Sequence, residues 1–181
     1  MRTFQAVVAA SILMLGLSAC GYFGESPAYQ VVSACDVVDV APYARLLNTS
    51  ADVEPEVRDD NDDDRSGCYY YIDDGTMLID ISIDTPTEPA AAEIFEEHRD
   101  QIKTESGWRS AALTGERSWT DSHAVTTMTS IVTTVDVAAL DRNLAVNVRV
   151  QIAFQEIEDA ALLPLVNETV NAIAEAAEIV A

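Results

Sequence analysis

The sequence predicts an α+β domain: an antiparallel sheet of about five to six strands, packed with helices and closed by a long C-terminal helix. Apolar residues alternate strictly with polar ones along Met77–Asp84 and Leu144–Phe154, as in half-buried strands. Directly before the first of these strands, Asp73-Asp74-Gly75-Thr76 is typical of a tight hairpin turn. Residues 157–180 have the apolar spacing of an amphipathic helix. Hairpin-linked strands imply an antiparallel sheet with one covered face.

In the first half of the domain we expect a short helix within Asp36–Asn48, with Asp39 as its N-cap and Pro42 in its first turn. A short edge strand interrupted by Pro55 follows at residues 52–57. The aromatic segment Cys68–Ile72 reads as the next strand. The predicted inward side of the helix consists of Val40, Tyr43, Ala44 and Leu47.

In the second half, Glu88–Glu105 is expected to be helical and to end at Ser106-Gly107. A short strand at Arg117–Trp119 and a β-rich, threonine-containing stretch at Val125–Val137 follow. The turn Asp141–Asn143 leads into the last strand, on which alternate residues including Phe154 point inward. The apolar face of the first long helix is Ala91, Ile94, Phe95, His98 and Ile102, and that of the last is Leu163, Val166, Val170, Ile173 and Ala177.

The N-terminus indicates export. One positive charge precedes an apolar run of about a dozen residues, Ala6–Leu17, which fits a signal peptide and is shorter than the roughly 20 residues that span a bilayer. The run ends in Leu17-Ser18-Ala19-Cys20, which resembles the bacterial lipobox, whose cysteine is lipidated. We therefore expect a signal peptide at 1–19, a lipidated tether at 20–30, a single domain at 31–181 and anchoring on the extracytoplasmic side of the cell membrane. The alternatives are a buried N-terminal helix and an ordinary secretory signal cut elsewhere.

The charge excludes several partners. The chain has 10 basic and 31 acidic residues, a net charge of −21, and removal of Arg2 with the signal peptide makes it −22. Such a surface repels nucleic acid and anionic lipid, which need Lys/Arg clusters. The lipid anchor is thus the one membrane contact that we predict. A salt-adapted host would also account for the acidity.

Two further cysteines, Cys35 and Cys68, form an even pair in an oxidising compartment, so a disulfide is expected. The alternatives are a reactive thiol and a metal pair. A metal pair needs additional ligands, and the histidines, His98 and His123, stand at unrelated spacings.

Several short motifs carry a family resemblance. They are the lipobox, the Cys35–Val38 opening before a short helix, the Cys68–Tyr71 strand, Gly115–Trp119, and the last strand and helix. With these the chain resembles a family of small actinobacterial lipoproteins of unknown function, related in pattern to the extracellular sensor domain of mycobacterial receptor Ser/Thr kinases. The resemblance implies an envelope protein with a binding or sensing role, and it carries no catalytic residue over.

Local chemistry is sparse. The loop Asp59–Asp64 offers acids at EF-hand positions 1, 3 and 5, but Arg65 and Tyr71 stand where that motif needs Gly and Glu. We expect a solvated loop that binds calcium weakly at most. Ser118 lies outside any Gly-x-Ser-x-Gly motif, and His98 falls on an apolar helix face. We therefore expect no enzyme, no cofactor and no metal centre.

Two functions remain. The first is a binding or sensing module for an envelope protein or small ligand, and the alternative is a structural or accessory envelope lipoprotein without a ligand of its own. A partner face is expected opposite the inward strand residues, at Asp80, Asn147, Arg149 and Gln151, and a cleft between Trp108 and Trp119. If Arg149 is a free surface cation, Arg149→Glu should abolish partner capture and leave the melting temperature nearly unchanged.

Overall fold

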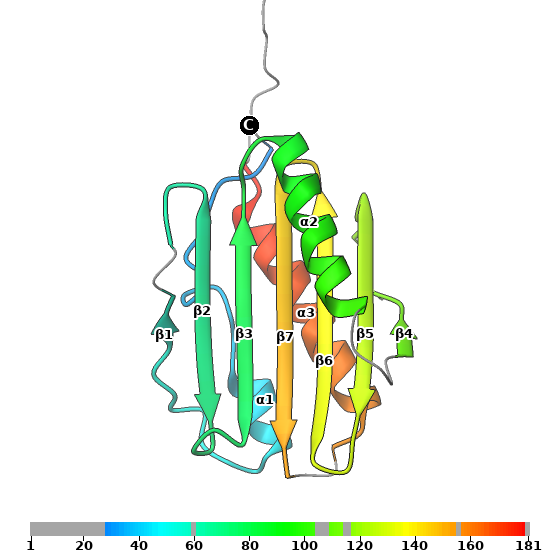
Figure 1. Ribbon diagram of the computed structural model, residues 1–181. Helices are drawn as coiled ribbons and strands as arrows, with labels where there is room; N and C mark the ends of the chain where they lie inside the picture. The colour runs from blue at the N-terminus through cyan, green and yellow to red at the C-terminus, as the bar shows by residue number, and fades with distance from the viewer. Residues whose placement is uncertain (1–27, 59–60, 104–108, 114–116, 155–156, 180–181) are drawn as a thin grey trace, which may run out of the picture.

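The computed structural model describes residues 28–58, 61–103, 109–113, 117–154 and 157–179 (Figure 1). Cys20 and Trp108 therefore lie outside the described residues. The elements, in chain order, are α1 (Ala41–Leu46), β1 (Glu56–Val57), β2 (Arg65–Ile72), β3 (Met77–Asp84), α2 (Glu88–Lys103), β4 (Arg109–Ala111), β5 (Asp121–Met128), β6 (Val132–Asp141), β7 (Leu144–Ala153) and α3 (Asp159–Ala177).

All strands belong to one antiparallel sheet with the order β1-β2-β3-β7-β6-β5-β4. The hairpin β2–β3 and the meander β4–β7 meet where β3 pairs with β7, so the last strand lies in the middle of the sheet (Figure 1). The predicted α+β class is confirmed. Six strands have three residues or more, and the two-residue β1 makes the sheet seven-stranded.

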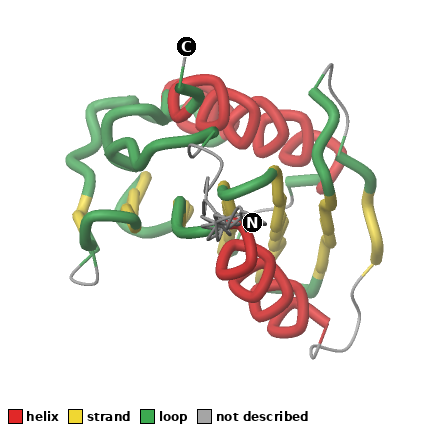
Figure 2. The backbone as a smooth tube through the Cα atoms, turned by 90° about the horizontal axis from the view of Figure 1, so that it is seen from above, coloured by secondary structure: helices red, strands yellow, loops and turns green. Residues whose placement is uncertain are grey.

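Helices cover both faces of the sheet. Seen along the strands, α3 lies on one side and α2 on the other (Figure 2). We call the side that carries α2 the front face; it is turned towards the viewer in Figure 1. The sequence predicted one covered face of the sheet. The apolar surface of α2 corrects this, because Ala91, Phe95 and Ile102 are buried against front-face residues.

The main core lies between the back of the sheet and α3. The inward residues of β3 and β7 are almost all fully buried, as their alternation predicts. They pack against a stripe on α3 that begins at Leu162 and not at Leu163, which is only partly buried. Leu162 continues the four-residue step back from Val166, which keeps it on the same helix face. The other buried residues of the stripe are Val170, Ile173, Ala174 and Ala177.

Several predicted boundaries shift. Asp39 is not the N-cap residue; Val40 is, although the Asp39 carboxylate still accepts the Ala41 N–H at 2.9 Å. The predicted strand Arg117–Trp119 is wrong, since this segment is irregular and the edge strand is β4. The Arg117 side chain reaches the hydroxyl of Tyr29 across the chain, so side-chain contacts and not strand pairing fix this segment.

The end of β7 departs most from the alternation. Phe154 was expected to point inward, but it is 84% exposed and has a φ of 59°. Its N–H donates to the Ile131 carbonyl at 2.8 Å, beyond the last regular strand pair. The left-handed conformation turns the backbone, so the two-residue period no longer decides where this ring points.

Both chain ends of the domain lie at one end of the sheet. The Asn143 side-chain oxygen accepts the N–H groups of Ala28 and Tyr29 at 3.0 and 3.1 Å. Tyr29 also forms an isolated antiparallel β-bridge with Glu178, directly after the C-terminus of α3. We call this the tether end. The β2–β3 and β5–β6 turns and the end of β7 lie at the opposite, distal end (Figure 1).

Candidate functional site

A row of paired charges crosses the front face. Arg149 on β7 lies between Asp80 on β3 and Asp136 on β6 in the sheet register. Its Nε and Nη2 atoms both lie 2.6 Å from the Asp136 Oδ2 atom. The Asn147 amide donates to the other carboxylate oxygen at 2.9 Å. Asp136 is completely buried, so these donors replace the water that its charge would otherwise need.

Asp80 is paired from the other side. Arg58, from the loop after β1, lies 3.3 Å from the Asp80 carboxylate and 5.4 Å from the centre of the Tyr69 ring. It crosses β2 at Gly67, where an added Cβ would lie 2.1 Å from the Arg58 Cδ. Burial raises the pKa of the Asp80 carboxyl, and the charges of Arg58 and Arg149 oppose that rise.

The residues of the predicted partner face share one side of the sheet, and their role in binding a partner stays a prediction. Asp80, Asn147, Arg149 and Gln151 all lie on the front face in neighbouring rows. Arg149 is not the free cation that the sequence suggested, because it compensates a buried carboxylate. The expectation that Arg149→Glu leaves stability nearly unchanged does not hold for this geometry. The row is charge-balanced and offers no net attraction to an anion.

Below this row the front face is open. Tyr71, Leu78, Gln151 and Thr134 are consecutive cross-strand neighbours on β2, β3, β7 and β6. Tyr71 is 48% exposed, and its ring centre is 6.4 Å from that of Tyr69. Thr134 is buried, so we call Tyr71, Leu78 and Gln151, together with Tyr69 beside Asp80, the open face. Helix α2 runs from the tether end across β7 and β6 and leaves the lower part of both strands uncovered (Figure 1).

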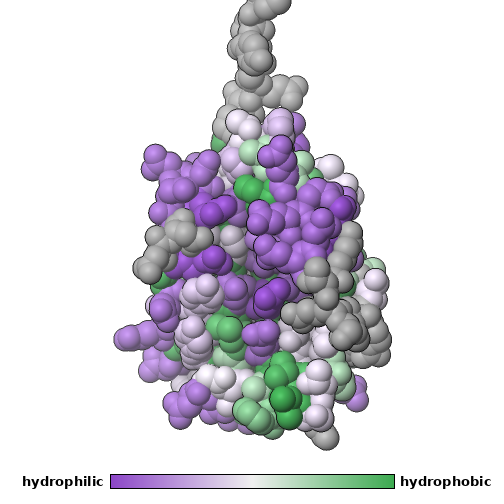
Figure 3. All heavy atoms as spheres, viewed as in Figure 1, coloured by the Kyte–Doolittle hydropathy of each residue, from purple (hydrophilic) through white to green (hydrophobic). Residues whose placement is uncertain are grey.

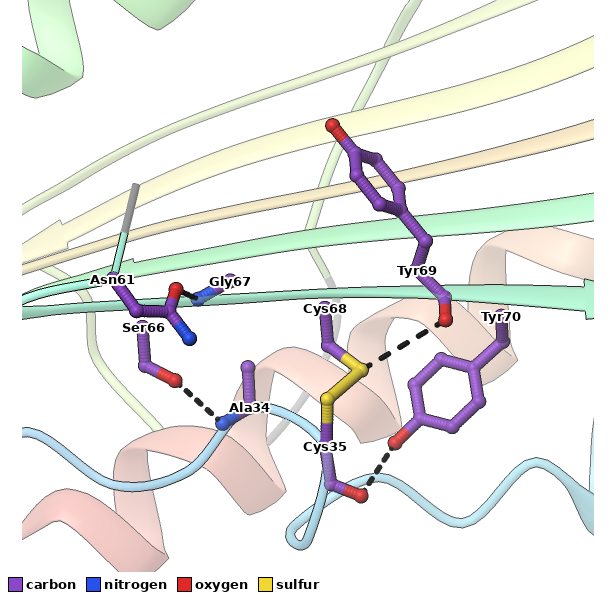
Figure 4. Close-up of a disulfide and its surroundings, with 8 residues drawn as sticks. All are labelled: Ala34, Cys35, Asn61, Ser66, Gly67, Cys68, Tyr69 and Tyr70. Carbon is purple, nitrogen blue, oxygen red and sulfur yellow. Dashed lines mark hydrogen bonds between the residues drawn. A yellow bond between two sulfur atoms is a disulfide. The ribbon is translucent and has the colours of Figure 1, made fainter. Parts of the chain in front are cut away.

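The predicted disulfide is confirmed and fixes the open face from behind. Cys35 and Cys68 are bonded and tie the N-terminal segment to β2. On the same side, the Tyr70 hydroxyl donates to the Cys35 carbonyl at 2.7 Å and the Ala34 N–H to the Ser66 hydroxyl at 2.9 Å. Tyr69 points to the opposite side of the strand (Figure 4). The back of β2 is thus pinned, while its front presents tyrosine rings.

Trp108 lies outside the described residues, so the predicted cleft between Trp108 and Trp119 stays a prediction. Trp119 is partly buried and packs against the main core. The Arg117 guanidinium lies 5.6 Å from its ring centre and also 5.6 Å from that of Tyr29. This cluster is at the tether end, where Arg117 also pairs with Glu178 at 3.4 Å. Trp119 therefore helps to fasten the N-terminal segment.

The acidic loop is described from Asn61 onward. The Asp64 N–H donates to the Asp62 side chain at 3.2 Å, and the Asn61 side chain accepts the Gly67 N–H at 2.6 Å. Hydrogen bonding to Asp64 lowers the pKa of Asp62, and hydrogen bonding to Asp62 raises that of Asp64. Weak calcium binding by this loop stays a prediction.

Sequence reasoning missed Asp136, Arg58 and Tyr69 as members of the site. The sequence could have indicated Asp136 as a site residue, because it is an acid inside an apolar, β-rich stretch. Arg58 had none, because its position depends on a loop that folds across Gly67.

Comparisons with known proteins support the fold. No protein-family model matches the sequence, and no curated protein matches it either. Among solved structures, the extracellular domain of PknH from Mycobacterium tuberculosis is similar, with a TM-score of 0.53 and 12% identity over 83% of this chain and 98% of that one. The chain shares its fold with that extracellular domain. Among the described residues, no helix has the length and apolarity to cross a membrane.

Proposed function

We propose that this chain is a lipid-anchored, extracytoplasmic binding module that captures an envelope ligand or protein partner on the open face. The observation that carries the proposal is a sheet face left uncovered by α2, where the exposed Tyr71 and the half-buried Gln151 lie beside internally neutralised charges. Tyrosine supplies contact area at low entropic cost, and the paired charges supply fixed hydrogen-bonding groups.

The position of the tether is consistent with this role. The described chain begins with Ala28 at the tether end, and the open face lies towards the distal end (Figure 1). An anchor at Cys20 would therefore leave the open face away from the attachment point. The extracellular nature of the structurally similar PknH domain and the Cys35–Cys68 disulfide support an extracytoplasmic location.

Anchoring is tested by fractionation. The wild type should partition into the detergent phase and the membrane fraction. Cys20→Ala lacks the residue that accepts the lipid, and stable anchoring needs two acyl chains. This variant should therefore be found in the aqueous and soluble fractions. If both proteins remain membrane-bound, the lipoprotein assignment fails. The Cys35–Cys68 disulfide serves as a folding control in both.

Binding is tested by capture from envelope extract. Tyr71→Ser and Gln151→Ala should reduce capture of the same partner without changing the melting temperature, because neither side chain is buried. Gln101→Ala, an exposed glutamine change on α2, is the matched control. Undiminished capture by both variants would refute the open face as the binding surface, and the absence of any captured partner would favour the accessory-lipoprotein alternative.

A further inference from the structure

A second surface, at the distal end, exposes large apolar side chains. Among the described residues, three of the six exposed large apolar side chains are here: Met128 at 49%, Ile131 at 57% and Phe154 at 84%. We call them the distal patch. They line one hollow of about 560 Å³ together with Ile157, Glu158 and polar residues of the β5–β6 turn. Figure 3 shows hydrophobic surface gathered at this end below a mostly hydrophilic face. A clustered apolar patch on a highly charged protein marks an interaction site.

The distal patch is held in place by backbone hydrogen bonds. The Thr129 N–H donates to the Val132 carbonyl at 2.8 Å, and the Phe154 N–H to the Ile131 carbonyl at 2.8 Å. The Thr129 hydroxyl also accepts the Val132 N–H at 2.9 Å. These bonds join the β5–β6 turn to the end of β7. The apolar side chains therefore project from a fixed frame, which lowers the entropic cost of binding.

Phe154 adds a conformational argument. Its φ of 59° is left-handed, which costs a bulky residue roughly 1–2 kcal/mol and which glycine adopts freely. The folded protein gains little burial in return, since the ring is 84% exposed. Strain that displays an unburied aromatic ring is characteristic of a functional position.

The surroundings of the distal patch are acidic. Glu158 lines the hollow. The exposed Asp73 and Asp74 lie in the neighbouring β2–β3 turn. This turn is held next to the end of β7, because the Ala153 N–H donates to the Thr76 carbonyl at 2.8 Å. Helix α1, whose last turn contains Arg45, lies behind the sheet at the same end (Figure 1). A net charge of −21 opposes the approach of a second copy or an anionic lipid surface. The complementary occupant is apolar and basic.

We propose that the distal patch docks a segment of a partner protein that carries an apolar anchor residue flanked by Lys or Arg. The anchor enters the hollow between Ile131, Phe154 and Ile157, and the flanking cations face Glu158, Asp73 and Asp74. This site is separate from the open face and does not depend on it.

The test uses immobilised full-length protein and three synthetic peptides with one shared apolar core, flanked by Lys, by Ser or by Glu. The wild type should bind the Lys-flanked peptide most tightly and the Glu-flanked peptide least, with the difference shrinking as salt is added. Phe154→Gly and Ile131→Ser should each lower the affinity for the Lys-flanked peptide by at least about tenfold. Val57→Ser, which removes an exposed apolar side chain from β1, is the matched control and should change nothing.

Two results would overturn the proposal. One is equal binding of the three peptides, or binding that is insensitive to Phe154→Gly while that variant keeps its melting temperature. The other is a concentration-dependent dimer of the wild type in sedimentation that Phe154→Gly abolishes, which would assign the patch to a second copy. Capture through the open face is unaffected by either result, so this proposal and the proposed function fail separately.

Discussion

Removal of Arg149 should be costly, because this side chain compensates a buried charge. In Arg149→Ala, the fully buried Asp136 carboxylate loses two contacts of 2.6 Å and keeps the Asn147 amide at 2.9 Å. Breaking a buried ion pair by removing one partner costs about 3–5 kcal/mol. Arg149 is itself 32% exposed in its side chain, so water can enter the space that it leaves. We therefore expect the lower end, about 3 kcal/mol.

For a domain of this size, about 3 kcal/mol lowers the melting temperature by roughly 6–12 °C. Urea denaturation of wild type and Arg149→Ala, followed by circular dichroism, gives the free energy of unfolding directly. In the background Asp136→Asn, the carboxylate is gone, so loss of Arg149 should cost about 1–3 kcal/mol less. Arg45→Ala, on an exposed position of α1, should change stability by under about 0.5 kcal/mol.

A loss for Arg149→Ala no larger than for Arg45→Ala would refute this reasoning. It would mean that Asp136 is not compensated by Arg149, and that the front face carries a free cation after all. The same outcome would restore the original expectation for Arg149→Glu.

Three further predictions concern stability. Replacing Cys35 and Cys68 by Ala should lower the free energy of unfolding by about 4 kcal/mol by the chain-entropy argument, because the bond closes a loop with a sequence separation of 33. Urea denaturation of this variant measures the loss, and a loss under about 1 kcal/mol would contradict the prediction. Gly67→Ala should destabilise by about 1 kcal/mol by displacing Arg58, and a double-mutant cycle should find no further loss once Arg58 is Ala. Burial holds the pKa of His98 below its ordinary 6.5, so the unfolded chain takes up a proton first as the pH falls. The stability contributed by neutral His98 is complete above pH 6.5 and declines below it. The free energy of unfolding of a His98→Gln variant should therefore fall less steeply with decreasing pH than that of the wild type. Parallel pH profiles of the two proteins would count against this prediction.

Much of the fold follows from local pattern. The bounds of β3 were predicted correctly and those of β7 to within one residue, because burial of one sheet face imposes a two-residue period on the sequence itself. The Asp136–Arg149 pairing is also accessible in principle, since the short turn at Arg142 and Asn143 sets the β6–β7 register. The limits are equally physical. Whether a face is covered depends on where α2 docks, which alternation does not encode.

The rest of the site depends on long-range geometry. Arg58 meets Asp80 only because a loop crosses the strand at Gly67. Asp80 meets Arg149 across the junction of two strands that are separated in the sequence by a helix and three further strands. Phe154 was misplaced because its left-handed backbone breaks the period that the strand before it obeys.

The central claim is that the open face contacts a partner in the envelope. Its most direct test is photo-cross-linking in living cells, with a photoreactive amino acid in place of Tyr71 in the full-length chain and, as control, in place of Glu175 on α3, on the opposite side of the sheet. We predict a discrete adduct from position 71 that is absent from position 175 and is reduced by Gln151→Ala. An adduct from position 175 alone, or from neither position, would contradict the claim.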